Sequence, residues 1–288
     1  MSAQTKLCAV TSLLLWIALP VRADEFADKG REVFKKHQRA VVTVQVVQKM
    51  TYSAGGRTGE PQETKQDITG TVVDPSGLTV LALSACDPSE MYKRMMTDSS
   101  RYKIESEVSD VKILLDDGAE IPSEIVLRDK DLDLAFIRPK AKQTTPMAAV
   151  DLSKSTPAQM LDQVITLNRL GRAAGRAHSA SVERVSAVVQ KPRTFYIPDS
   201  TMTGTALGSP AFALDGSIVG LMVMRTLTAA GGATMNNFRP DNATSIILPA
   251  EDVLKAARQA PEAKGDDEKK SEEKKADAKE PKEKKEEK

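Results

Sequence analysis

The period of the hydrophobic positions changes soon after the start of the chain. Phe26, Val33 and Phe34 recur at helical spacing among charged residues between positions 25 and 38, which predicts an amphipathic helix. Residues 41–47 are instead a β-branched, apolar run, which is typical of a strand. The pattern therefore predicts one short helix that leads into a β-rich region.

Apolar runs separated by turn residues continue along the chain. Asp74-Pro75-Ser76-Gly77 has the proline and glycine positions of a type I turn, and Asp215-Gly216 is a hairpin signal. Residues 251–259 carry apolar side chains on one helical face and predict a closing helix. Further strands are predicted at residues 68–73, 78–83, 111–115, 121–127, 132–137, 164–167, 182–189, 211–214, 218–224 and 244–248.

Many short strands with frequent turns predict an all-β protein, built as a sandwich or as a pair of barrels. The segment 142–157 is rich in Thr, Ser and Pro and is the predicted linker between two halves. We therefore expect residues 24–140 to hold the N-terminal helix and a first barrel. Residues 141–260 are expected to hold a second barrel and the closing helix.

The first 23 residues are predicted to be an export signal. Lys6 supplies a positive charge, residues 7–19 are mostly apolar, and Val21-Arg22-Ala23 has small residues where a signal peptidase requires them. The apolar stretch is shorter than the roughly 20 residues of a membrane span. We therefore expect cleavage before Asp24, a periplasmic or extracellular location and no stable membrane span. An uncleaved N-terminal anchor is the alternative.

The predicted tail, residues 261–288, differs in composition from the rest of the chain. From Glu262 onward nearly every residue is Lys, Glu, Asp or Ala. Such a segment cannot bury enough apolar surface to offset its conformational entropy, so it is predicted to be disordered. Its charges nearly cancel, which argues against a polybasic arm for nucleic acid or lipid.

Composition narrows the possible functions further. The formal net charge of +1 argues against nucleic-acid binding. Cys8 lies in the predicted signal, so Cys86 would remain alone and no internal disulfide could form. We expect no metal and no cofactor, because the sequence has neither Cys/His ligand spacing nor a nucleotide-binding loop. Asn242 begins a glycosylation sequon, which matters only in a eukaryotic source.

The chain contains the segments GTVVDPSGLTVL at residues 70–81, DLDLAFI at residues 131–137 and SIILP at residues 245–249. Together they resemble segments of trypsin-like serine proteases of the bacterial Deg (high-temperature-requirement) type. Residues 70–81 are similar without gaps to the family's G-F-I-I-S-P-D-G-Y-V-L-T. Residues 131–137 resemble its aspartate strand, and residues 245–249 resemble the strand that ends its protease domain. The resemblance implies a chymotrypsin/trypsin-like double β-barrel.

The same resemblance implies that two of the three positions of the family's catalytic triad (histidine, aspartate and serine) carry other residues here. The family's T-N-N-H follows its glycine segment directly, which puts Ser84 at the histidine position and Asp133 at the aspartate position. Counting back from Asp215-Gly216 through the G-N-S-G-G-P pattern puts Leu207 at the serine position. The leucine side chain has no nucleophilic group. Ser209 is the fallback nucleophile, although a turn hydroxyl is its better interpretation.

The remaining candidate site residues are the two histidines, Asp133 and Cys86. His37 and His178 are the only histidines, and both are expected to be surface or partly packed residues away from the catalytic position. Asp133, without a histidine partner, should be held by backbone N–H groups or be exposed. Cys86 is either a thiol in the former cleft or, in the preferred interpretation, a small buried apolar residue.

Three functions follow from these patterns. The favoured hypothesis is an exported pseudoprotease that binds a peptide or protein in its cleft or along a strand edge. An atypical active serine endopeptidase is the alternative. The third hypothesis is a structural envelope protein in which the charged tail matters most.

Overall fold

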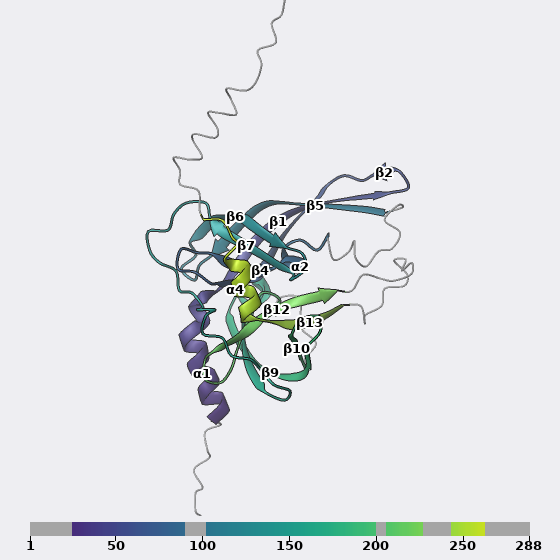
Figure 1. Cartoon of the computed structure of the whole chain (residues 1–288). Coiled ribbons are helices and arrows are strands. Elements are labelled where there is room, and N and C mark those ends of the chain that lie inside the picture. The colour runs from purple at the N-terminus through teal and green to yellow at the C-terminus, as the bar shows by residue number, and fades with distance from the viewer. Residues whose placement is uncertain (1–24, 90–101, 200–205, 227–242, 263–288) are drawn as a thin grey trace, which may run out of the picture.

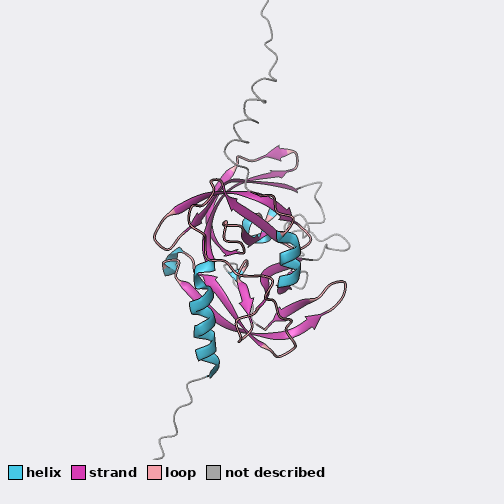
Figure 2. Ribbon diagram, turned by 60° about the vertical axis from the view of Figure 1, so that its left-hand side comes forward, coloured by secondary structure: helices cyan, strands magenta, loops and turns pink. Residues whose placement is uncertain are grey.

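The computed structural model describes residues 25–89, 102–199, 206–226 and 243–262, and the structural statements below concern these residues. Within them the chain forms two β-barrels, one above the other, with a few short helices (Figures 1 and 2). This confirms the predicted all-β fold with about six strands in each barrel. The predicted signal, the sequon at Asn242 and nearly all of the charged tail lie outside the described residues.

The first barrel closes through six antiparallel strands in the order β1-β3-β4-β7-β6-β5, with β5 pairing back onto β1. A strand of two residues, β2, pairs with the far end of β1. The strands are β1 (Val41–Ala54), β2 (Arg57–Thr58), β3 (Gln62–Val72), β4 (Thr79–Ala82), β5 (Tyr102–Leu114), β6 (Glu120–Asp129) and β7 (Leu134–Pro139). The run at the start of β1 is buried on both faces, because Val42, Val44 and Val46 pack inside this barrel and Val41 packs in the core between the barrels.

The turn predicted between β3 and β4 is present. The Gly77 N–H donates to the Asp74 carbonyl over 2.9 Å, and the Ser76 N–H donates to the Asp74 carboxylate over 2.8 Å. Gly77 has a φ of 97°, a value that an L side chain rarely adopts. The hydrogen bonds within this turn therefore fix where the chain reverses between β3 and β4.

The second barrel closes in the order β10-β13-β12-β11-β8-β9. Its strands are β8 (Gln163–Arg169), β9 (His178–Val189), β10 (Phe195–Pro198), β11 (Pro210–Phe212), β12 (Ile218–Thr226) and β13 (Ala243–Pro249). A short 3-10 helix, η2 (Arg172–Ala174), lies in the connection between β8 and β9. β10, β2 and the first half of β5 were not among the predicted strands.

Apolar side chains from both barrels form one continuous core between them. Phe136 and Leu134 of β7 pack in the same cluster as Phe212 and Leu221 of the second barrel. Two helices add to this core through Val33 and Val253: α1 (Glu25–His37) and α4 (Ala250–Ala257). The barrels are therefore packed against each other across a shared apolar interface.

A third helix, α2 (Leu83–Cys86), follows β4 directly. The sequence pattern predicted a strand that includes Leu83, but the strand ends at Ala82 and is followed by a single helical turn. The Asp87 N–H donates to the Leu83 carbonyl and closes this turn. None of the helices in the described ranges is both long enough and apolar enough to cross a membrane.

Candidate functional site

Asp133 lies in the turn between β6 and β7, at the junction of the two barrels. Its carboxylate accepts the Ser84 N–H over 2.7 Å, the Ser84 hydroxyl over 2.8 Å and the Met224 N–H over 2.8 Å. Two of these donors are backbone groups, which confirms the expectation for Asp133. Its φ of 58° lies in the left-handed region, which Asp tolerates better than most residues.

Ser84 is brought to Asp133 by the short helix that follows β4. The Leu83 N–H also donates to the Asp133 carbonyl over 2.9 Å, so the two segments are joined by both backbone and side-chain bonds. Ser84 uses its N–H on one carboxylate oxygen and its hydroxyl on the other. Ser84 therefore contacts both oxygens of the Asp133 carboxylate.

Leu207 and Ser209 lie in the segment that leads into β11. Leu207 is only 6% exposed and belongs to the core between the barrels. Ser209 is fully buried, and its hydroxyl has no hydrogen-bond partner among the described residues. A hydroxyl in this position is not accessible to a substrate.

Gly208, between these two residues, lies directly against the backbone of the first barrel. The Gly208 N–H donates to the Met222 carbonyl, and its own carbonyl accepts the Thr71 hydroxyl of the first barrel over 2.8 Å. Its φ is 89°, and a Cβ there would lie 2.3 Å from the Thr69 carbonyl oxygen. Only glycine satisfies both restrictions.

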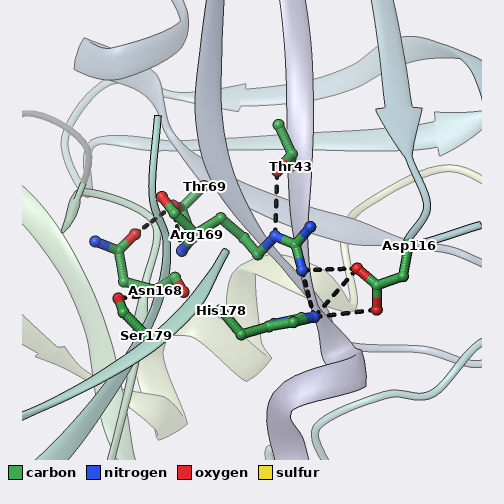
Figure 3. Close-up of polar contacts among 7 residues, drawn as sticks. All are labelled: Thr43, Thr69, Asp116, Asn168, Arg169, His178 and Ser179. Carbon is green, nitrogen blue, oxygen red and sulfur yellow. Dashed lines mark hydrogen bonds and ion pairs between the residues drawn. The ribbon is translucent and has the colours of Figure 1, made fainter. Parts of the chain in front are cut away.

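The structure does not bring His178 to this site. His178 Nε2 lies 3.0 Å from an Asp116 carboxylate oxygen and also contacts the Arg169 guanidinium (Figure 3). Arg169 in turn bonds Thr43 and Asp116 over 3.2 and 2.7 Å, which ties the second barrel to the first. Partial burial opposes the ionisation of Asp116, but hydrogen bonds with His178 and Arg169 outweigh it and lower the pKa of Asp116.

His37 also lies away from Asp133, packed against another side chain. Its ring stacks on Phe212 with centroids 4.3 Å apart, and its Nε2 is buried with no hydrogen-bond partner among the described residues. Burial and the nearby charge of Lys36 lower the pKa of His37, against a hydrogen bond with the Gly216 backbone. Both histidines are therefore partly packed side chains, as expected.

Cys86 is fully buried in the core of the first barrel. Burial raises the pKa of its thiol to about 12, so almost no reactive thiolate exists near neutral pH. This confirms the interpretation of Cys86 as a small apolar residue. Across the described residues no group of three His, Cys, Asp or Glu side chains could hold a metal ion.

A cavity of about 190 Å³ opens beside Asp133, between the barrels. The first barrel contributes Ser84, Asp87 and the turn before β7; the second contributes Phe195, Ile246 and the end of β12. Its cationic lining residues are Lys130, Arg193 and Arg225. Sequence reasoning missed the two arginines, although the alternation of β12 places Arg225 on the same face as the buried Leu221 and Val223.

Sequence comparison identifies the class of protein. The family model described as "Trypsin-like peptidase domain" matches residues 68–221, so the chain belongs to the trypsin-like peptidase domain family. A search of curated protein sequences found no match. Among solved structures, the chain is similar to the apo MamO protease domain from Magnetospirillum magneticum, with a TM-score of 0.48 and 14% identity. That alignment covers 77% of this chain and 97% of the MamO domain.

Proposed function

We propose that this protein is an exported, catalytically inactive member of the family, of the Deg type, that binds an extended peptide segment in the cleft between its barrels. The observation that carries the proposal is the contact of Ser84 with both oxygens of Asp133. In an active triad an imidazole bonds the aspartate and takes the proton of the nucleophile. A serine hydroxyl at this position orients the carboxylate but cannot act as a base near neutral pH.

The nucleophile position supports the same proposal. Leu207 carries no group that could form an acyl-enzyme, and Ser209 is sealed in the core with its hydroxyl unpartnered among the described residues. Loss of the serine or the histidine of such a triad lowers kcat by about 10⁶-fold. With both changed, hydrolysis through this site would be negligible.

The edge of β12 that no described strand covers favours peptide binding as the proposed role. One edge of β12 pairs with β13 as far as Thr226, whereas β11 covers the other edge only up to Leu221. No described strand covers the second edge at residues 224–226, where the cavity opens. The Met224 N–H on this edge already donates to Asp133, so a peptide would pair with the Met224 carbonyl and with Thr226. An extended peptide could add there as a further strand and place a side chain in the cavity.

The lack of hydrolysis is tested with the intact exported protein. Casein cleavage and fluorophosphonate labelling should stay at background, and Leu207→Ser alone should restore neither. Leu207→Ser combined with Ser84→His serves as a comparison that supplies both missing groups. Proteolysis by the wild type that disappears in Ser209→Ala would overturn the proposal and favour an active endopeptidase.

Export rests on the composition of residues 1–23, a positive charge followed by an apolar stretch and a small-residue cleavage site. N-terminal sequencing of the protein from the exported fraction should begin at Asp24. Recovery of the protein with Met1 intact would contradict export by cleavage of this signal. The Deg type rests on the segment 70–81 and its spacing to Ser84.

A further inference from the structure

The row of β12 side chains that faces the first barrel changes from apolar to cationic at the cavity. Leu221 and Val223 are 2% and 1% exposed, and two residues further along the same face is Arg225. The guanidinium carbon of Arg225 lies 4.8 Å from the centre of the Phe195 ring. This stacking restricts the side chain and leaves the edge of the guanidinium able to donate.

Arg193 supplies a second guanidinium to the same cavity from the loop before β10. It is exposed, and no hydrogen bond or ion pair joins it to the described part of the chain. Two arginines from separate segments of the second barrel thus line one small cavity. One of them is stacked on an aromatic ring, and the other has its donors available.

The cavity wall also contains three carboxylates, those of Asp87, Asp131 and Asp133. Asp133 already accepts three hydrogen bonds, and Asp87 accepts two, from the N–H and the hydroxyl of Ser89. Lys130 and Asp131, neighbours in the turn before β7, add one charge of each sign. The lining is therefore formally neutral, but its charges are divided: all three aspartates come from the first barrel, and both arginines come from the second.

We propose that this cavity selects its peptide by a carboxylate, which Arg193 and Arg225 bind. The inference rests on the proposed peptide-binding function and narrows the ligand to an acidic peptide. A guanidinium matches the two oxygens of a carboxylate with parallel N–H donors, and the Phe195 ring provides an apolar surface beside it. The carboxylate belongs either to an Asp or Glu side chain or to the C-terminus of the peptide.

The experiment uses the full chain, immobilised, and a random dodecapeptide library in two forms, one with a free C-terminus and one amidated. Asp and Glu should be enriched at one position of the retained peptides by about tenfold over the input library, which corresponds to about 1.4 kcal/mol. Enrichment in both forms assigns the carboxylate to a side chain. Retention that requires the free C-terminus, with no Asp or Glu enrichment, assigns it to the terminal carboxylate.

Two variants test the roles of Arg193 and Arg225, and a third variant is their control. Arg193→Gln and Arg225→Gln should each abolish most of the acidic selection while thermal unfolding stays unchanged. Arg57→Gln, an exposed arginine on β2, should select as the wild type does. Peptide capture by the wild type without acidic or C-terminal preference overturns the inference but leaves peptide binding intact. Undiminished selection by both variants also overturns it, whereas no capture from either library rejects the proposed function itself.

Discussion

At the scale of single residues, Ser84 and Asp133 show how a carboxylate can be kept at the junction of the barrels without an imidazole. A buried or half-buried carboxylate is costly unless donors satisfy it. Two backbone N–H groups and one hydroxyl do so here. The hydroxyl is the only one of the three donors that a substitution can remove.

Ser84→Ala should therefore lower the free energy of unfolding by about 1–2 kcal/mol, because a bond to a charged acceptor is lost while two backbone donors remain. Urea unfolding followed by far-UV circular dichroism measures this. Ser153→Ala is the matched control, since the Ser153 hydroxyl also bonds an aspartate but at an exposed site. The control should change stability by less than about 0.5 kcal/mol. Equal effects of the two substitutions would contradict a structural role for Ser84.

The sequence predicted part of this site and missed the rest for a physical reason. Asp133 follows from a local pattern, and its need for backbone donors follows from the cost of burying a charge. Arg193 and Arg225 are far apart in the chain and carry no local signal of a shared role. They line one cavity only because β10 and β12 both neighbour β13 in the closed barrel.

At the scale of elements, the segment 206–209 matters because the second barrel meets the backbone of the first barrel there. Gly208 donates to Met222 within its own barrel and accepts from Thr71 across the junction. The space beside its Cα is filled by the Thr69 carbonyl. The turn that leads into β11 is thus also a contact surface.

Gly208→Ala should prevent stable folding, because the new methyl group would overlap a carbonyl oxygen 2.3 Å away that cannot move without shifting β3. Gly118→Ala is the control: its φ of 85° is similar, but nothing lies within 4 Å of the added Cβ. The control should cost only about 1–2 kcal/mol for the left-handed backbone. Soluble yield and thermal unfolding of both variants measure the difference, and a Gly208→Ala protein as stable as the control would contradict the close approach.

Strands with strong apolar runs were predicted well, and strands without them were missed. The first half of β5 carries Lys103, Glu105 and Glu107 on one face, so its sequence resembles a solvated segment. It becomes a strand because β1 offers a long antiparallel partner. β10 has only four residues and depends on β9 and β13 at either side. Pairing partners, rather than local propensity, decide such strands.

At the scale of the whole molecule, polar contacts join the barrels around the apolar interface. Arg169 of β8 reaches Thr43 of β1 and Asp116 of the β5–β6 turn (Figure 3). A second set lies at Asp67 of β3, whose side chain is only 6% exposed. Asp67 accepts hydrogen bonds from Arg172 and Arg176, both in the β8–β9 connection.

Asp67 should make the stability of the two-barrel unit depend on pH in the acid range. Burial opposes its ionisation, but hydrogen bonds from Arg172, Arg176 and Gln45 outweigh this and lower the pKa of Asp67 from 3.8 to about 2. The native state therefore binds a proton less readily than the unfolded state does. The resulting stabilisation is complete above about pH 5 and is lost as the pH falls through the interval from about 4 to about 2.

Asp67→Asn should lower the free energy of unfolding at pH 5, by no more than about 2 kcal/mol because solvent screens the partly exposed arginines. The difference from wild type should shrink as the pH falls towards 2, since every other titrating group is common to both proteins. Urea unfolding at pH 5, 3.5 and 2.5 measures it. Asp28→Asn is the control, because its ion pair with Arg31 is exposed and lies within one helix, and it should change stability little at any of these pH values. A difference for Asp67→Asn that stays constant from pH 5 to 2.5 would show that the carboxylate charge is not what joins the two barrels at this point.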